Sequence, residues 1–291
     1  MEASGETALV TGATSGLGKA AAIHLAERGY RVFAAGRSGE RRAALQATAR
    51  ERQLALTAIE MDVRDDASVA RAMAQIEEAG ASIDVLINNA GVAYVAPVEE
   101  IRMADLREQF EINVFGAVRV TQRVLPKMRA RGRGRIINMS SLAGRLAFPL
   151  FGAYSGSKFA LEGMTDALRL EVYPFGIDVV LIEPGYIPTA MEQTAIELGS
   201  RYRESLEHGP YANVYRNFIR AWRRGTSGTR TTAEDCARVV LRAVRETPPR
   251  ARYTVTPGSQ LMLWGKRLLP ERLRERLMRR TFDLTRGDLK R

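Results

Sequence analysis

The stretch that decides the fold is Thr11-Gly12-Ala13-Thr14-Ser15-Gly16-Leu17-Gly18, between a short apolar run, Thr7 to Val10, and the helix-favouring residues 19 to 27. Glycines at three fixed positions allow a tight turn and let the backbone approach a ligand closely. The N–H groups and positive end of the following helix favour a pyrophosphate. Three glycines alone can occur by chance, but the order strand, turn, helix predicts a nucleotide-binding unit.

Further along the chain, short apolar runs alternate with longer segments of helical period, as in βαβ units of a parallel sheet. The strands expected on this basis are Thr7–Val10, Arg31–Ala35, Leu54–Ile59, Ile83–Ile87, Arg135–Asn138, Ile177–Ile182 and Tyr253–Thr256. No repeat or flexible linker divides them. We therefore predict one α/β domain built on a doubly wound parallel sheet of about seven strands.

Two late segments depart from this pattern. Residues 184–231 are too long for a plain connection, which predicts a partly helical substrate lid over 186–230. Thr231 and Glu234 are expected to form a capping box that opens the next helix. Residues 258–291 read as a basic amphipathic helical tail of the same domain, whose body spans 1–257. One apolar face of the tail, with a helix break at Pro270, is formed by Leu261, Trp264, Leu268, Leu269, Leu273 and Leu277.

The charge is concentrated in this tail. The 291 residues carry a net charge of +11, and residues 266–291 hold ten basic and four acidic residues, a balance of +6. We expect the apolar face to pack on the same protein or on a second subunit, in a homo-oligomer (dimer or tetramer). Peripheral contact with anionic lipid remains the alternative. No recognised nucleic-acid module accompanies the charge, so no nucleic-acid partner is predicted.

Composition narrows the chemistry further. The single Cys236 excludes a disulfide framework and a multi-cysteine zinc site, and the two histidines, His24 and His208, stand far apart, so we predict no metal. No run of about 18 apolar residues is long enough for a membrane span, and the N-terminus does not read as a secretory signal. We expect a cytoplasmic protein, with peripheral membrane association left open by the tail.

Residues at the ends of the predicted strands bear on the cofactor. The second strand ends in Gly36-Arg37 without the carboxylate that would bind an adenosine ribose and repel a 2′-phosphate, which favours NADP(H). NAD(H) is left open because Ser15, not a basic residue, precedes Gly16. Asn89, Ala90 and Gly91 follow the fourth strand. Asp62 is expected beside the adenine or as a helix cap.

The strongest constellation is Ser141, Tyr154 and Lys158. Tyr154 and Lys158 are four residues apart, so on a helix the phenol and the ammonium share one face. In a dry crevice the cation can lower the pKa of the phenol towards neutrality, which requires roughly 4 kcal/mol for about 3 pH units. A solvated surface pair cannot supply this. The three residues predict an acid/base centre.

Taken in order, TGATSGLG, NNAG, Ser141 and Tyr154-x-x-x-Lys158 resemble the short-chain dehydrogenase/reductases, over about residues 7–189. The resemblance implies a Rossmann-type domain and a catalytic tetrad of Asn113, Ser141, Tyr154 and Lys158. The cofactor contacts predicted from the motifs and the resemblance together are Gly12, Thr14, Ser15, Gly16, Leu17, Gly18, Gly36, Arg37, Asp62, Val63, Asn89, Ala90, Gly91, Tyr154, Lys158, Pro184, Gly185, Ile187 and Thr189. Gly156 departs from the usual alanine, which suggests a close helix contact.

The function expected from these features is NADP(H)-dependent interconversion of an alcohol and its ketone or aldehyde, with Tyr154 as acid/base. The apolar lid and residues 146–151 favour a lipophilic small-molecule substrate, and the motif pattern is most similar to steroid- and retinol-type members. One alternative is a 3-oxoacyl reductase whose carrier protein docks on lid arginines, namely Arg201, Arg203, Arg216, Arg220, Arg223 and Arg224. Another is a catalytically silent NADP-sensing or membrane-interaction protein.

Overall fold

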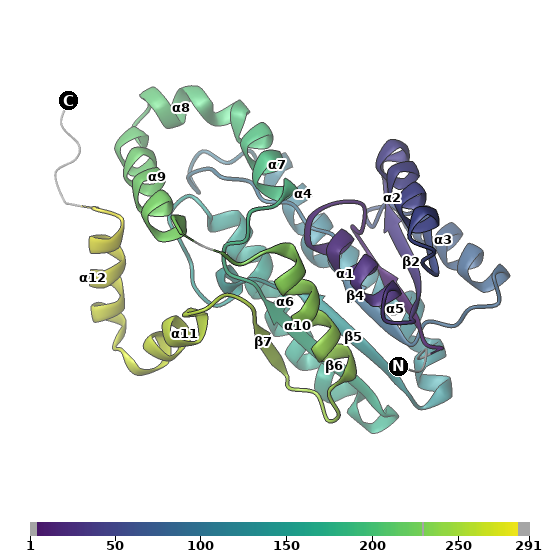
Figure 1. Ribbon diagram of the computed structural model, residues 1–291. Helices are drawn as coiled ribbons and strands as arrows, with labels where there is room; N and C mark the ends of the chain where they lie inside the picture. The colour runs from purple at the N-terminus through teal and green to yellow at the C-terminus, as the bar shows by residue number, and fades with distance from the viewer. Residues whose placement is uncertain (1–4, 229, 285–291) are drawn as a thin grey trace.

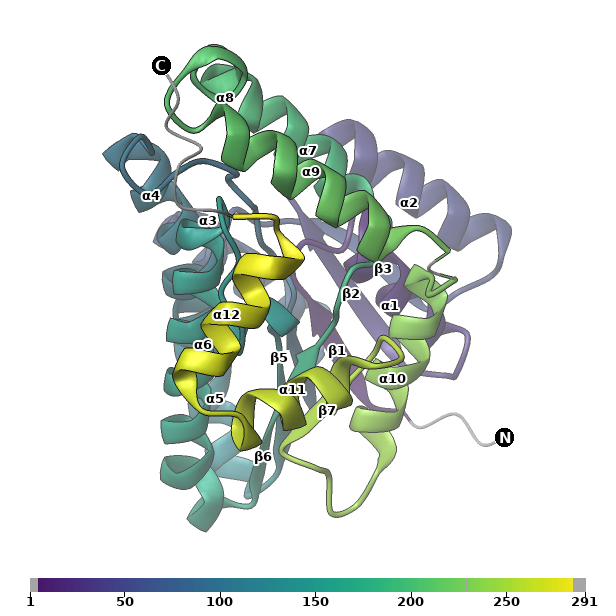
Figure 2. The same ribbon diagram turned by 90° about the vertical axis from the view of Figure 1, so that its left-hand side faces the viewer.

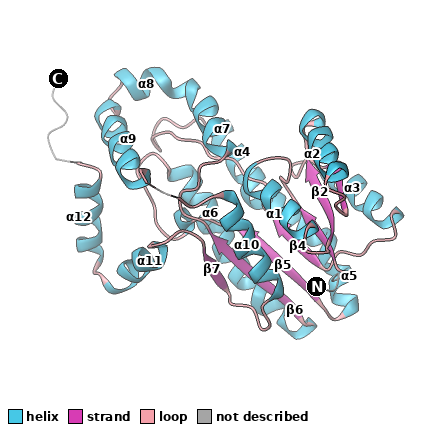
Figure 3. Cartoon of the chain, in the orientation of Figure 1, coloured by secondary structure: helices cyan, strands magenta, loops and turns pink. Residues whose placement is uncertain are grey.

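Seven parallel strands form one sheet in the order β3-β2-β1-β4-β5-β6-β7 (Figure 1, Figure 3). The computed structural model describes residues 5–228 and 230–284, without the side chains of residues 190, 192–194 and 196. The strands are β1 (Thr7–Val10), β2 (Arg31–Gly36), β3 (Leu56–Glu60), β4 (Val85–Asn88), β5 (Gly134–Met139), β6 (Ile177–Glu183) and β7 (Arg252–Thr254). The predicted doubly wound sheet is confirmed.

Helices cover both faces of the sheet (Figure 2). One face carries α1 (Gly16–Ala26), α2 (Gly39–Glu51) and α10 (Ala233–Arg245), and the other carries α3 (Asp66–Glu78), α5 (Gly116–Arg131) and α6 (Gly152–Val172). Successive strand residues point to opposite faces. In β1, Ala8 and Val10 therefore join the first core and Leu9 the second. Burial on both faces explains why the strands read as continuous apolar runs.

The strand order determines where a ligand can bind. After β1 the chain builds β2 and β3 on one side and then crosses to β4 on the other, so β1 lies between β2 and β4. Ligands of such sheets bind at the carboxyl ends of the strands where the order reverses. The glycine-rich turn after β1 and residues 89–91 after β4 meet at that point.

The segment beyond β6 is more helical than the sequence indicated. It forms α7 (Ala190–Gly199), a 3₁₀ turn (Ser200–Tyr202), α8 (Arg203–His208) and α9 (Ala212–Thr226), drawn in green in Figure 1. The capping box prediction was wrong by one residue, because Thr232 and Asp235 make the reciprocal bonds at α10. The earlier part of the chain adds α4 (Met103–Phe110), a π-helical turn (Glu111–Phe115) and 3₁₀ turns at Leu142–Gly144 and Tyr173–Phe175.

The tail forms two helices, α11 (Ser259–Leu268) and α12 (Glu271–Thr281), with the predicted break at Pro270. The prediction that its apolar stripe packs on the same protein is wrong for α11, because Leu261 is 77% and Leu268 71% exposed. The end of the tail does pack. Phe282 is buried and stacks on Phe218 of α9 at 5.7 Å between ring centres. Figure 1 shows this end of α12 next to α9.

Within the part of the chain that the structure describes, no helix is both long and apolar enough to cross a bilayer. The same residues contain no group of three or more His, Cys, Asp or Glu side chains that could hold a metal ion. Residues 285–291 of the predicted tail lie outside the described residues.

Candidate active site

Polar residues after β4 hold the glycine-rich turn in place. Asn89 donates from Nδ2 to the carbonyl oxygens of Thr11 (3.0 Å) and Gly12 (3.2 Å), while the Thr11 hydroxyl accepts from the amides of Asn89 and Ala90. Gly12 has a φ of +63°, and a Cβ there would lie 2.8 Å from Ala90 Cα. A Cβ at Gly18 would collide with Asn89 Nδ2. These two glycines are therefore required by the turn itself.

The start of α1 fits a dinucleotide phosphate. Ser15 is the N-cap residue, yet among the described residues its side chain makes no cap hydrogen bond. The first N–H groups of α1 and its positive end are therefore suited to an anion. A Cβ at Gly16 would lie 3.5 Å from Thr189 Cβ, so the segment after β6 borders the turn. Ile187 is buried in the core beneath, with Leu17 packed against the same core.

The ends of β5 and β6 are joined directly. The Pro184 carbonyl accepts from the Leu142 amide at 2.8 Å and from the Ser141 hydroxyl at 3.4 Å. Gly185 lies against Thr256, and a Cβ there would collide with the threonine hydroxyl. The predicted residues Pro184 and Gly185 thus connect Ser141 to the segment after β7.

Arg37, after β2, is a half-exposed cation. Its side chain is 54% exposed and lies 4.0 Å from Asp62, which is more closely paired with Arg64 at 2.7 Å. Burial acts to raise the pKa of Asp62, but hydrogen bonds from Arg64 and the charges of Arg64 and Arg37 hold it below its usual value. The cap that Asp62 was expected to provide is made by Asp65 instead. Arg37 keeps its charge largely available to a ligand.

Two further residues predicted to contact the cofactor, Gly36 and Val63, pack closely against other parts of the chain. A Cβ at Gly36 would lie 2.8 Å from Thr14 Oγ1 and even closer to its methyl group, so Gly36 makes room for Thr14. Val63 packs against Gly116 at the start of α5, where a Cβ would lie 2.7 Å from Val63 Cγ2. Val63 therefore fixes α5 against the chain after β3.

Three of the predicted catalytic side chains meet between β5 and α6. Ser141 follows β5, and Tyr154 and Lys158 lie on α6 one turn apart. Ser141 and Tyr154 share a side-chain hydrogen bond. The Lys158 Nζ lies 5.8 Å from the centre of the Tyr154 ring and donates to the Met139 carbonyl at 2.7 Å. Tyr154 is 9% and Lys158 3% exposed, so the centre is dry.

Burial dominates the protonation of both groups. It raises the pKa of the Tyr154 phenol, which the hydrogen bond with Ser141 counteracts only in part. Burial also lowers the pKa of Lys158 to about 8, and the charge of Glu162 opposes this. The lysine remains mostly protonated at pH 7. The pKa of Tyr154 thus moves opposite to the expected direction, because desolvation outweighs the hydrogen bond with Ser141.

Asn113 lies in the π-helical turn between α4 and α5. Its Nδ2 donates to the Val92 carbonyl and to the Ser157 hydroxyl, both at 3.0 Å, and its Oδ1 accepts from the Val92 amide at 2.9 Å. A Cβ at Gly91 would lie 3.3 Å from Asn113 Oδ1 and 3.8 Å from Lys158 Nζ. The π turn, a feature frequent at functional sites, thus places Asn113 beside Ser157 of α6 and, across Gly91, near Lys158.

Apolar side chains pack against the buried ring of Tyr154. Phe151 packs edge-on against its ring at 5.9 Å and stacks on Trp222 of α9 at 5.5 Å. Phe148 and Met191 lie in the same cluster. Rings from the loop before α6, from the predicted lid and from the tail thus form one continuous apolar region beside the acid/base centre.

The family model for short chain dehydrogenases matches residues 6–197. The chain belongs to the short-chain dehydrogenase/reductase family. It is 35% identical over 267 residues to an uncharacterized oxidoreductase, YusZ, of Bacillus subtilis, covering 90% of this chain and 93% of that protein. It is 32% identical over 278 residues to an NADPH-dependent 3-dehydrocapnine reductase of Ornithobacterium rhinotracheale, covering 93% and 95%.

A third relative is retinol dehydrogenase 8 of Bos taurus, 32% identical over 262 residues, covering 88% of this chain and 83% of that protein. Among solved structures, a short-chain dehydrogenase from Streptomyces avermitilis is similar with a TM-score of 0.74 and 30% identity, covering 95% of this chain and 96% of that one. The chain is thus an oxidoreductase of the alcohol–ketone type, from a family that binds NAD(P).

Sequence reasoning missed the residues that support this dehydrogenase site. Asn88 donates to Asn138 Oδ1 at 2.9 Å, and Asn138 donates to Thr165 of α6 at 2.9 Å, which ties β4, β5 and α6 together. The available signal was an asparagine near the carboxyl end of each of two strands, directly after apolar residues. Ser157, which holds Asn113, had no such signal because it lies in a helix.

Two interpretations of the short-chain dehydrogenase sequence need correction. Gly156 makes no close helix contact, because a Cβ there would lie 3.7 Å from Phe110, an ordinary van der Waals distance. Among the lid arginines proposed as a docking face, Arg201 pairs with the buried Asp105 at 2.6 Å and Arg224 pairs with Asp283 at 3.0 Å. Pairing within the chain weakens the case for a carrier-protein surface.

Proposed function

We propose that this enzyme is an NADP(H)-dependent oxidoreductase that interconverts a lipophilic alcohol and its ketone or aldehyde. The observation that carries the proposal is the aromatic cluster against Tyr154, in which Phe151 touches both the catalytic ring and Trp222. Such a surface favours a large apolar substrate, since roughly 25 cal/mol is gained per Å² of apolar area removed from water. The named activity of the bovine relative, a retinol dehydrogenase, points the same way.

The chain's own residues support acid/base work by Tyr154. A bound nicotinamide dinucleotide supplies the hydride in the reducing direction. Tyr154 donates its proton to the substrate oxygen, and the Ser141 hydroxyl, which bonds the phenol, is placed to bond that oxygen as charge develops. The protonated Lys158 offsets the negative charge left on the phenolate. In the oxidising direction the same groups act in reverse.

The preference for NADP(H) is supported by Arg37. Its half-exposed guanidinium, at the end of a strand without a carboxylate, suits a 2′-phosphate. The similarity to a reductase named as NADPH-dependent agrees with this. The alternative that the protein is a silent NADP sensor is not favoured, because the chain has the expected residue at all four tetrad positions.

A cofactor-consumption screen tests the proposal. NADPH and NADH are each offered with steroids, retinoids, acyl thioesters and small ketones. We expect the highest kcat/KM for NADPH with a bulky apolar carbonyl. Trp222→Ala should lower kcat/KM for that substrate at least tenfold, because a lost apolar contact costs about 1–3 kcal/mol. For a small ketone, which does not reach Trp222, kcat/KM should stay within about twofold of the wild-type value. Preference for acyl thioesters would instead support the 3-oxoacyl reductase alternative.

We also propose that the tail contacts anionic lipid. On α11, Leu261, Trp264 and Leu268 are 77%, 57% and 71% exposed, and basic side chains flank them. Sedimentation with anionic vesicles at low salt should carry the protein down, and high salt should release it, because about 1 kcal/mol per basic residue is screened. Leu268→Glu should weaken binding, whereas Leu170→Glu on α6 should not. Failure to bind at any salt concentration would contradict the proposal.

The homo-oligomer remains a prediction. Apolar side chains at the end of α6 and just after it are exposed, with Leu170 at 77% and Tyr173 at 79%. Such residues favour burial against a second copy. Sedimentation velocity should give a dimer or tetramer, and a monomer at micromolar concentration would contradict this.

A further inference from the structure

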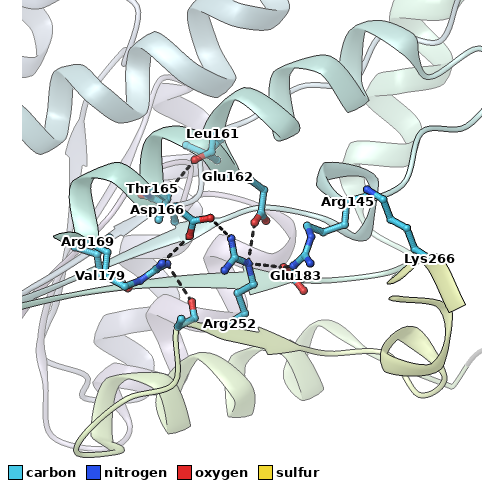
Figure 4. Close-up of polar contacts among 12 residues, drawn as sticks. Arg145, Leu161, Glu162, Thr165, Asp166, Arg169, Val179, Glu183, Arg252 and Lys266 are labelled. Atoms are coloured by element: carbon cyan, nitrogen blue, oxygen red, sulfur yellow. Dashed lines mark hydrogen bonds and ion pairs between the residues drawn. The ribbon is translucent and has the colours of Figure 1, made fainter. Parts of the chain in front are cut away.

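A partly buried ionic cluster lies beside the catalytic helix α6 (Figure 4). At its centre is Arg252 of β7, whose Nε lies 3.1 Å from Glu162 Oε2 and 3.3 Å from Glu183 Oε1. Its Nη2 bonds Asp166 at 2.5 Å. Arg145, close after Ser141, makes a second ion pair with Glu183 at 2.9 Å. The side chains of Glu162 and Glu183 are only 7% and 1% exposed, so these two carboxylates are buried, whereas Arg252, Arg145 and Asp166 reach the surface.

Glu162 connects this cluster to the active site. It lies on α6 four residues after Lys158, and long helical side chains point back towards the preceding turn. Both residues also border Gly144. A Cβ at Gly144 would lie 3.1 Å from Glu162 Cγ and 3.2 Å from the Lys158 carbonyl oxygen. With both residues buried, charges act on each other more strongly than in water.

We propose that Glu162 is a positioning residue for the reaction, whose negative charge, held by Arg252, keeps Lys158 protonated beside Tyr154. The polar contact that Lys158 Nζ makes is with the Met139 carbonyl, a neutral group. Of the charged groups around the lysine, Glu162 is the one that opposes the loss of its proton, against burial, which lowers the pKa of Lys158 to about 8. This inference rests on the proposed catalytic role of Lys158.

Arg252 has a defined part in this arrangement. Burial raises the pKa of Glu162, and the neighbouring carboxylate of Glu183 raises it further. Arg252, by its charge and its hydrogen bond, and the Ser140 hydroxyl act in the opposite direction. Asp166 shares Arg252 from the next turn of α6, and Arg145 takes up part of the charge of Glu183. The pKa of Glu162 is raised on balance, and Arg252 limits that rise, so the arginine favours the ionised carboxylate that stabilises the lysine cation.

The protonation of Lys158 can be measured directly. The chain contains five lysines, so ¹³C-labelled lysine gives few signals, and Lys158→Arg removes the one to be assigned. In the protein without cofactor, the Cε signal of Lys158 should titrate with a midpoint near 8. Glu162→Gln should lower this midpoint by about one pH unit, because it removes an opposite charge. Glu162→Asp keeps the charge and should restore part of the shift.

Asp166→Asn is the matched control. It removes a carboxylate from the same helix and the same arginine, but not the one that acts on Lys158, so the midpoint should stay within about 0.2 pH units. In the pH profile of kcat/KM, Glu162→Gln should lose about fivefold at pH 8 and little at pH 6, which is the change in the protonated fraction of Lys158.

An unchanged midpoint in Glu162→Gln overturns the inference, as does an equal shift in Asp166→Asn. If the Gln variant folds poorly, Glu162→Asp replaces it: the shorter side chain draws the carboxylate back from Lys158, so its midpoint must fall below the wild-type value, and an unchanged midpoint there overturns the inference as well. If the midpoints shift as expected but the wild type reduces no carbonyl, the coupling stands and the proposed function fails instead.

Discussion

Tyr154 lies in an environment that opposes its own ionisation. The ring is buried, burial raises the pKa of the phenol, and the hydrogen bond with Ser141 only partly counteracts this. A neutral phenol is the state needed to donate a proton, so the reducing direction begins from the protonation state that the chain itself favours. The oxidising direction begins from the phenolate and should accelerate as pH rises, in agreement with the sign of the shift.

Tyr154→Phe removes the transferable proton and keeps the ring. We expect kcat to fall at least 100-fold, because general acid catalysis typically contributes 100-fold to 10,000-fold. The affinity for NADPH, measured by fluorescence titration, should stay within about threefold. Activity within tenfold of the wild type would contradict the assignment of Tyr154.

Arg37 gives a cleaner test of cofactor choice than Gly36 does, because any side chain at Gly36 would collide with Thr14. Arg37→Met should raise KM for NADPH about tenfold to hundredfold, since a charge-assisted hydrogen bond is worth roughly 1.5–3 kcal/mol. KM for NADH should change less than twofold. Arg50→Met, at an exposed position on α2, is the control. Equal losses for both cofactors would disprove this role.

The candidate site was largely predictable at this scale, because Ser141, Tyr154 and Lys158 follow from spacing and strand ends. The pKa values of these side chains could not be predicted in the same way. Whether Lys158 or burial determines the pKa of Tyr154 depends on three-dimensional desolvation, which no local pattern reveals. The Glu162–Arg252 pair joins residues 90 positions apart and was equally invisible in the sequence.

At the scale of elements, helix α6 contains a glycine, Gly156, at a position where its packing leaves room for a larger side chain. Gly156→Ala should raise the free energy of unfolding by about 0.5–1 kcal/mol, because alanine loses less conformational entropy and its Cβ fits beside Phe110. Urea denaturation measures this, with activity expected to be unchanged. The helical control is Gly116→Ala, whose Cβ would meet Val63 at 2.7 Å and should destabilise. Destabilisation by Gly156→Ala would point to a contact outside the single chain.

The positions of the strands could be predicted from the sequence. The strands were located within two residues because they are apolar on both faces. The lid was expected to be only partly helical: α9 has a clear amphipathic pattern, but the sequence did not show where α7, α8 and α9 begin and end. The cap at α10 was misplaced because Thr231 and Thr232 both satisfy the pattern and only the backbone geometry distinguishes them.

At the scale of the whole molecule, the tail makes its main apolar contact with the body at its end, in addition to the polar contact of Lys266 with Arg145. Phe282 stacks on Phe218 at 5.7 Å and packs against Phe148 at 6.3 Å. Phe282→Ala should lower hydrogen-exchange protection of the α12 amides by up to about 100-fold, for a loss of roughly 3 kcal/mol, and leave the sheet unchanged. Leu277→Ala, 43% exposed, is the control and should change little. Equal loss of protection in β4 and β5 would mean that the tail is part of the main core.

The chain contains two tryptophans, and the fold separates them. Trp222 stacks on Phe151 beside the acid/base centre, whereas Trp264 stands 57% exposed on α11. The protein therefore carries two native optical reporters. In Trp264→Phe, the emission that remains senses a ligand entering the aromatic cluster. In Trp222→Phe, it senses only the surroundings of the tail, and a blue shift on adding vesicles would register the tail leaving water. Substrate arrival and surface attachment can thus be followed separately, without an added label.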